Sequence, residues 1–160
     1  EEIGFVISVM SGEQDRIDIA QAAAQQLQEI GINCTVDIPA QMDWGGQMAC
    51  LIGWGSPFDA DDHTYKVFGT DKGANYSGYS NEKVDEYLTL ARQYEDKETR
   101  AKYYDLFQEE LAKDPAYAFI CYIDANYVAD SDIKGISEKT VLGHHGVGIF
   151  WNIQEWEIVK

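Results

Sequence analysis

An aromatic and acidic cluster lies near the middle of the sequence, where the run 53–59 (Gly-Trp-Gly-Ser-Pro-Phe-Asp) is followed closely by Asp61. The cluster begins at the end of a short apolar segment, residues 48–54. This segment predicts a strand buried on both faces. Ligands of open α/β sheets bind beyond the carboxyl ends of the strands. An aromatic ring offers apolar contact there, and a carboxylate can pair with a ligand ammonium group.

The cluster therefore predicts a binding site for a small solute. In this interpretation Trp54 and Phe58 form an apolar wall, and Asp59 or Asp61 is the polar anchor. The residues assigned to the site are Trp54, Gly55, Phe58, Asp59 and Asp61. A structural explanation is equally open, in which Trp54 belongs to the core and the aspartates only cap a loop.

Metal-binding and cofactor motifs are not evident. His63 follows Asp59, Asp61 and Asp62, whose oxygens a hard cation would accept, but the spacing lacks the glycine and distal glutamate of a calcium loop. Adjacent histidines such as those at 144–145 point to opposite faces of an extended chain, and the glycines around them indicate a surface turn. We expect neither a metal nor a cofactor.

Catalytic signatures are also missing from the sequence. It contains no Gly-x-Ser-x-Gly elbow, no phosphate-binding glycine loop and no His-Glu-x-x-His pair, so we expect a protein that is not an enzyme. Two rivals from other classes stay open. One is a carboxylate-dependent hydrolase that uses the acids of 59–62, and the other is a carbohydrate-binding module built on Trp44, Trp54 and Trp151.

The first third of the chain predicts the elements that would position this cluster. A β-branched run at 5–10 is followed by apolar residues at helical spacing over 17–27 and by alternating residues at 32–38, which indicate strand, helix and strand. Ser11 and Gln14 match a capping box, and Gly31 is placed to end the helix. A parallel βαβ unit is expected.

The remainder predicts further helices and strands in a single α/β domain over 1–160, a mixed sheet with flanking helices. Apolar stripes indicate helices over 84–94 and 101–111, and Asp114-Pro115 should end the second. Two strands are expected at 117–122 and 126–129, as a hairpin turning near Asp124. A final strand is expected at 149–153. Residues 55–63 and 69–80 are expected to be loops.

Charge and cysteine content narrow the function further. The chain has 12 basic and 28 acidic residues and a net charge of −16, which argues against nucleic-acid binding and against docking on anionic lipid. The three cysteines, Cys34, Cys50 and Cys121, are too few for a disulfide framework and are expected to be small buried hydrophobic residues. The sequence starts at Glu1 without a signal-like segment, which fits a processed, a cytosolic or a shortened chain.

Several segments, in this order and spacing, resemble the C-terminal lobe of family 5 extracellular solute-binding proteins, the peptide and nickel receptors of ABC importers. They are residues 27–36, 51–59 and 75–85. Residues 100–117 and the strands expected after them look like the family's terminal helix pair and return strands. The resemblance implies a periplasmic-binding-protein type II-like lobe that closes with an N-terminal lobe, absent from this chain, around a peptide or related solute. It also implies a membrane-embedded ABC permease as partner and an extracytoplasmic location, with a lipid anchor in the full-length protein.

Two departures from the family pattern leave the solute open. Many peptide receptors place an aspartate three residues after the loop tryptophan, where this chain has Pro57. The run 54–59 is closer to nickel-type receptors, but those carry a histidine near the position of Lys72 or Gly73, where this chain has none. A nickel or metal-chelate receptor of the same family is therefore the alternative to a peptide receptor.

Overall fold

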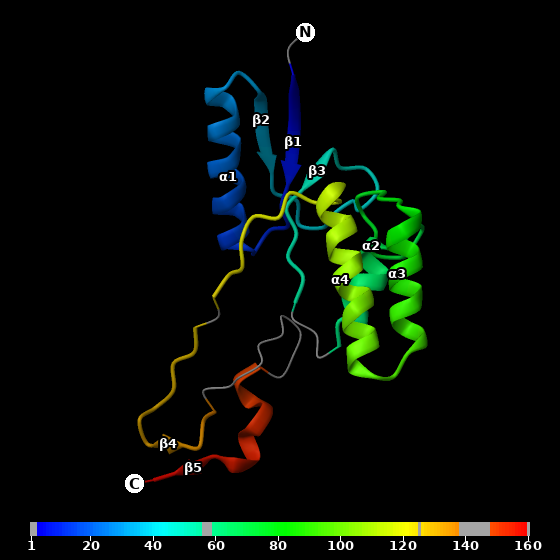
Figure 1. Cartoon of the computed structure of the whole chain (residues 1–160). Coiled ribbons are helices and arrows are strands. Elements are labelled where there is room, and N and C mark those ends of the chain that lie inside the picture. The colour runs from blue at the N-terminus through cyan, green and yellow to red at the C-terminus, as the bar shows by residue number, and fades with distance from the viewer. Residues whose placement is uncertain (1–2, 56–58, 125, 138–147, 160) are drawn as a thin grey trace. The chain divides into compact units, whose positions relative to one another are not determined.

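The computed structural model describes residues 3–55, 59–124, 126–137 and 148–159, and it divides the chain into two compact units, 1–53 and 54–160. Each unit has its own hydrophobic cluster. No helix in the described part of the chain has the length and apolar character needed to span a membrane. The chain is of the α/β class, as expected (Figure 1).

Unit 1 is built on a parallel βαβ arrangement, which confirms the prediction. Strand β1 (Gly4–Ser8) leads to helix α1 (Gln14–Glu29) and then to β2 (Asn33–Asp37), which pairs with β1 in parallel. A two-residue strand, β3 (Ala49–Cys50), pairs in parallel with the other edge of β1. The strand order is β2-β1-β3, so β1 is the central strand and the segment 48–54 supplies only a short edge.

Helix α1 lacks a side-chain cap at its start and ends in a glycine-based motif. The predicted capping box is wrong, because the helix begins after Glu13 without a side-chain cap and the Gln14 amide donates to Asp18 instead, at 2.7 Å. The predicted end at Gly31 is confirmed. Its φ of +87° allows the Gly31 N–H to bond the Gln28 carbonyl and the Ile32 N–H to bond the Leu27 carbonyl, each at 3.0 Å, which is a Schellman motif.

The core of unit 1 lies between α1 and the sheet. Val9, Ile17 and Ala20 are buried together, with Ile7, Val36 and Leu51 packed around them. This arrangement follows from the sequence, because Ile17 and Ala20 lie three positions apart on α1 and so share one face of the helix.

Unit 2 contains three helices, α2 (Asp61–Phe68), α3 (Glu82–Gln93) and α4 (Lys97–Lys113). Helices α3 and α4 match the predicted apolar stripes, and each begins with a side-chain cap, Asn81 for α3 and Asp96 for α4. Their facing residues form the larger core, in which Leu88 is 1% exposed; the other buried members are Val84, Phe107 and Leu111. Helix α2 was not predicted, because residues 55–63 were interpreted as a loop.

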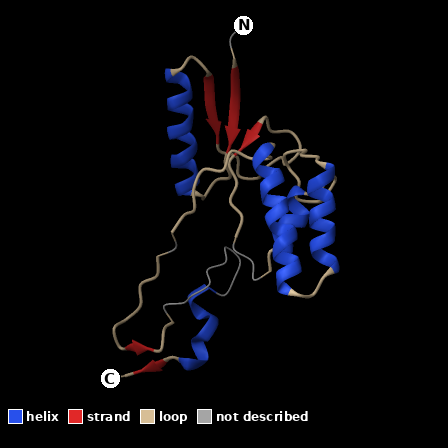
Figure 2. Cartoon of the chain, in the orientation of Figure 1, coloured by secondary structure: helices blue, strands red, loops and turns tan. Residues whose placement is uncertain are grey.

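The C-terminal third departs most from the predictions. No strand or hairpin forms in the described residues of 117–129, and the segment 149–153 lies inside a 3-10 helix, Gly148–Glu155, rather than a strand. A two-residue antiparallel pair, β4 (Ile133–Lys134) with β5 (Glu157–Ile158), is present instead (Figure 2). Strands need a partner to supply their backbone hydrogen bonds, and none of the described residues supplies one to 117–129.

Cysteine burial was also predicted incorrectly in part. Cys34 is buried as expected, Cys50 is half-buried and Cys121 is exposed. Cys121 belongs to the same segment that lacks its predicted strand partners, so its exposure has the same cause.

Candidate functional site

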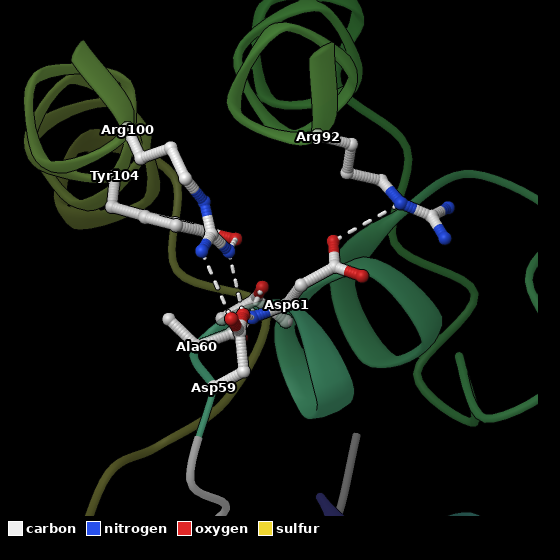
Figure 3. Close-up of polar contacts among 7 residues, drawn as sticks. Asp59, Ala60, Asp61, Arg92, Arg100 and Tyr104 are labelled. Atoms are coloured by element: carbon white, nitrogen blue, oxygen red, sulfur yellow. Dashed lines mark hydrogen bonds and ion pairs between the residues drawn. The ribbon is translucent and has the colours of Figure 1, made fainter. Parts of the chain in front are cut away.

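Asp59 forms a two-pronged ion pair with Arg100. The Arg100 guanidinium of α4 donates to both carboxylate oxygens of Asp59, at 2.9 and 2.6 Å (Figure 3). The Asp61 backbone N–H, at the start of α2, donates to the same carboxylate at 2.9 Å. Bidentate guanidinium–carboxylate pairs are among the most directional polar contacts in proteins. The pair therefore fixes the end of the segment that carries Trp54 against α4, within unit 2.

These contacts change the acidity of Asp59. The hydrogen bonds from Arg100, and next that from the Asp61 backbone, lower the pKa of Asp59 from its ordinary 3.8 to about 2. The same ion pair raises the pKa of the Arg100 guanidinium above its usual range. The Asp59 side chain is half exposed, so solvent screens the pair and its contribution to stability is modest. Asp59 is ionised at any physiological pH.

Replacing Arg100 with glutamine should raise the pKa of Asp59 from about 2 toward 3.8, because the largest cause of the shift is removed. Since the folded-state pKa lies below the unfolded value, the pair stabilises the fold above about pH 4 and loses this effect as the pH falls through 2. A carboxyl-carbon NMR titration measures the change directly. Arg92→Gln is the matched control and should leave the Asp59 titration where it is; an unshifted Asp59 in Arg100→Gln would contradict the assigned pair.

Asp61 has its own arginine partner. Its Oδ1 atom lies 3.2 Å from Nε of Arg92, on α3, at the distance of an ion pair although without the geometry of a hydrogen bond (Figure 3). The Arg92 guanidinium also lies over the Tyr65 ring, 4.0 Å from its centroid, which holds it in place. Both predicted anchor carboxylates are thus already paired within the chain.

An open depression of about 680 Å³ contains these pairs. Four carboxylates and two guanidinium groups line it together with Tyr94; the charged residues are Asp59, Asp61, Asp62, Glu95, Arg92 and Arg100. Asp62 is also paired, with Lys66 at 3.2 Å, so Glu95 is the carboxylate that leaves the described lining slightly acidic. Such a surface favours a cationic group over an anionic one.

Trp54 belongs to a separate aromatic group in unit 2. Its ring stacks on Tyr76, with centroids 6.1 Å apart and planes 13° from parallel, and it lies 5.5 Å from the His63 ring. The Trp54 residue is 38% exposed, so the indole is neither buried in the core nor fully free. Nδ1 of His63 lies 3.1 Å from the Gly55 carbonyl oxygen, and it must donate there because a carbonyl only accepts. This contact brings Gly55 into the aromatic group.

The structure thus brings together part of the predicted site. Asp59 and Asp61 line one depression, whereas Trp54 and Gly55 lie with the aromatic group and do not line it. Phe58, with Ser56 and Pro57, lies outside the described residues, as do His144 and His145. Three partners, Tyr76, Arg92 and Arg100, were not predicted, because they come from other parts of the chain and no local pattern marks them. The ring contact between His63 and Trp54 was not predicted either.

The structure bears on the two rival interpretations, a hydrolase and a carbohydrate-binding module, and on metal binding. A hydrolase that used Asp59 as general acid would need a raised pKa, and the pKa of Asp59 is lowered to about 2. Trp44, Trp54 and Trp151 are each 37–43% exposed, so none of the three indoles is buried and their exposure does not exclude a carbohydrate-binding module. Among the described residues, no group of three or more His, Cys, Asp or Glu side chains is arranged to hold a metal ion.

A second, smaller depression lies in unit 1 and was not predicted. It has a volume of about 200 Å³ and lies at the carboxyl ends of β1 and β2, where Ser8 and Asp37 line it. Other residues that line it come from the loop after β2 and include Gln41, Asp43 and Gln47.

Comparison with known proteins identifies relatives, although no protein-family model matches the chain. The oligopeptide-binding protein AppA of Bacillus subtilis is 25% identical over 174 aligned residues, which cover all of this chain and 30% of AppA. The chain therefore spans about a third of the length of the curated protein that it matches.

Solved structures of similar proteins also superpose on this chain. The structure of NikZ from Campylobacter jejuni in complex with Ni(L-His) is 37% identical and superposes with a TM-score of 0.79, over 97% of this chain and 33% of NikZ. The structure of AppA from Bacillus subtilis in complex with a nonapeptide superposes with a TM-score of 0.75 and 23% identity, over 100% of this chain and 32% of AppA. The likeness to AppA supports the periplasmic-binding-protein type II-like fold, and the likeness to NikZ extends to sequence. The chain is thus related over its whole length to family 5 extracellular solute-binding proteins, and it corresponds to about one third of such a protein.

Proposed function

We propose that the chain is the C-terminal lobe of a two-lobe receptor that binds a peptide or a related small solute for an ABC importer. The observation that carries this proposal is the 37% identity to NikZ over 97% of the chain. NikZ was solved in complex with Ni(L-His) and AppA in complex with a nonapeptide, so both solute classes come into consideration. The proposed lobe comprises residues 1–160 and is not an enzyme.

The chemistry of unit 2 supports a solute with an apolar part and a cationic part. Trp54, which is stacked but partly exposed, offers an indole face, and Gly55 and Phe58 follow it in the sequence. Asp59 and Asp61 remain in the proposed site, although each is already paired with an arginine. A ligand ammonium would therefore meet a network of paired charges, since Asp62 is itself paired with Lys66 at 3.2 Å. Glu95 is the lining carboxylate that would favour it.

The proposed partners and location follow from this role. The solute would be enclosed between this lobe and an N-terminal lobe, and the loaded receptor would deliver it to a membrane-embedded permease. Such a receptor works outside the cytoplasm, in the periplasm or at the cell surface, and we propose a lipid anchor for the full-length protein. Closure of two lobes around a ligand is a common hinge motion.

The proposal is tested by calorimetric titration of the full-length protein with a nonapeptide and, separately, with Ni(L-His). Saturable binding of one of them at a ratio of one to one would support a receptor. Turnover of the solute, or no binding of either class together with no ligand carried through purification, would contradict it. Native mass spectrometry of the purified protein identifies a carried ligand.

A specific observation favours the metal-chelate alternative as a second candidate. His63 donates through Nδ1 to the Gly55 carbonyl, so in that tautomer the lone pair is on Nε2, which lies 3.9 Å from an Asp62 carboxylate oxygen. Metal-binding histidines commonly hold the other ring nitrogen in this way, since the contact fixes the tautomer. His63 thus offers a ligand nitrogen beside Trp54, in place of the histidine missing near Lys72.

His63→Gln should weaken binding of Ni(L-His) to the full-length protein at least about tenfold, because glutamine offers no imidazole nitrogen. Nonapeptide binding should change little, since the Trp54 ring stays in place. Asp105→Asn is the control, as it removes an exposed charge on α4 that does not line the depression. Equal Ni(L-His) affinity in His63→Gln and the parent protein would exclude His63 as a metal ligand.

A further inference from the structure

Arg16, in the first turn of α1, has a guanidinium group that is largely buried and poorly partnered. Its side chain is 16% exposed, and its charged partner is Glu13, whose Oε2 atom lies 3.1 Å from Nη1. Within the part of the chain that the structure describes, the Arg16 side chain forms no hydrogen bond. A guanidinium carries five N–H donors, and buried polar groups are normally hydrogen-bonded. Arg16 therefore has donors available for a group from outside the chain.

Gly53 lies against the other edge of the same guanidinium. A Cβ atom built on Gly53 would lie 2.6 Å from Nη2 of Arg16, 2.9 Å from Nε and 3.0 Å from Cζ. The two nitrogens are nearer than the carbon between them, so the Nε–Nη2 edge faces the space that a side chain at position 53 would fill. The φ angle of Gly53 is not positive, so its backbone conformation does not itself require glycine. The missing side chain keeps this edge of Arg16 open.

The open edge of Arg16 has the donor geometry that suits a carboxylate. Nε and Nη2 present two parallel N–H groups, which bind the two oxygens of a carboxylate side by side. Neither nitrogen belongs to the side-chain atoms that are sealed from solvent without a partner. A carboxylate from outside can therefore reach them.

The position of Arg16 and Gly53 in unit 1 is one where ligands of parallel sheets bind. Helix α1 follows the carboxyl end of β1, and Gly53 follows the carboxyl end of β3, which is parallel to β1. In the strand order β2-β1-β3, β2 and β3 lie on opposite sides of β1 (Figure 1). Ligands of open α/β sheets bind beyond the carboxyl ends, where the strand order reverses in this way.

We propose that Arg16 is a specificity-determining residue, which binds a carboxylate group of the solute through its Nε–Nη2 edge, and that Gly53 keeps this edge open. The solute is then one with a free carboxylate, from either the C-terminus of a peptide or an amino acid bound to a metal ion. The inference rests on the proposed function, because it presumes that the chain binds a solute.

A purely structural role for Arg16 would require only its pairing with Glu13. The two residues are three positions apart at the start of α1, and the Glu13 side chain is 33% exposed, so this pair contributes little to stability. It also leaves the Nε–Nη2 edge unused. A structural role and a binding role differ in one measurable respect, because only the second makes affinity depend on the carboxylate of the solute.

Arg16→Gln in the full-length protein tests this dependence. Calorimetric titrations compare a nonapeptide with its C-terminal amide and, in the presence of Ni²⁺, L-histidine with L-histidinamide. For the solute that binds, the parent protein should prefer the carboxylate form at least about tenfold, as expected for hydrogen bonds between charged groups. Arg16→Gln should lose this preference. Lys102→Gln, which removes an exposed positive charge on α4, is the control and should keep it.

Gly53→Ala provides a second, independent variant. Its methyl group would meet Nη2 and Nε, so the preference for the carboxylate form should fall as in Arg16→Gln. In the Arg16→Gln background the same replacement should cause no further loss, because the edge that it blocks is gone.

Three results would overturn the proposed role of Arg16. The first is equal affinity of the parent protein for the carboxylate and amide forms, which leaves the receptor intact and decides the matter even if Arg16→Gln failed to fold. The second is a preference that survives Arg16→Gln, and the third is additive losses from the two replacements. No binding of either solute class would instead contradict the receptor itself, and the role of Arg16 with it.

Discussion

Replacing Trp54 with alanine in the full-length protein should weaken solute binding by at least about 1 kcal/mol, roughly fivefold or more. The indole is 38% exposed and is held by stacking on Tyr76 at 6.1 Å, so it is both accessible to a ligand and restrained. A restrained aromatic ring gives contact area at little cost in conformational entropy. Isothermal titration calorimetry with the solute found in the binding tests measures the loss.

Trp151→Ala is the control for Trp54→Ala. Trp151 is 43% exposed, close to Trp54, but it lies in the 3-10 helix far along the chain and outside the proposed site. Its removal should leave the affinity unchanged. Equal affinities for the Trp54→Ala variant and the parent protein would remove the indole from the site and, with it, the aromatic part of the proposed mechanism.

Leu88→Ala should have the largest effect on stability, a loss of about 2–5 kcal/mol in the free energy of unfolding. Leu88 is 1% exposed in the cluster between α3 and α4, where Val84, Phe107 and Leu111 surround it. Truncation would leave a cavity that these helices cannot readily close. Urea unfolding followed by circular dichroism measures the change.

Leu90→Ala provides a comparison on the same helix. Leu90 is only partly buried and does not belong to the cluster, so its truncation should cost clearly less than that of Leu88. The two variants share the change in helix propensity, and the difference between them isolates the effect of burial. Equal losses would show that the α3–α4 cluster is not the main core of unit 2.

Elements with local signals were predicted well from the sequence. The βαβ unit, the end of α1 at Gly31 and the helices α3 and α4 are confirmed, because apolar periodicity and a glycine with positive φ act within a few residues. The end of α4 before Pro115 has the same local origin.

Elements that depend on distant partners were predicted poorly. Residues 117–122 have strong strand propensity, but a strand requires neighbours, and the described part of the chain offers none. Residues 149–153 form part of a 3-10 helix, which includes the buried Asn152, whose amide donates to the Gly135 carbonyl at 2.8 Å. Such a contact across 17 residues has no signature in the local sequence.

In the candidate site, too, features with a local signal were predicted and contacts with distant residues were not. The sequence marked Trp54, Asp59 and Asp61 as exposed groups near a strand end, and the structure places the two aspartates in one depression. The sequence did not indicate that Arg100 is the partner of Asp59, because 41 residues separate them and either could have paired elsewhere. Charge pairs across such distances are fixed by packing of helices, here of α2 with its neighbours in unit 2.

The boundary between the two compact units, at Gly53 and Trp54, has an evolutionary consequence. Every predicted site residue follows that boundary, while the parallel sheet and its core of Val9, Ile17 and Ala20 precede it. Replacements among residues 54–63 would therefore leave the core positions of the sheet unchanged. Two solved structures that superpose on this chain hold such different ligands as a nonapeptide and Ni(L-His).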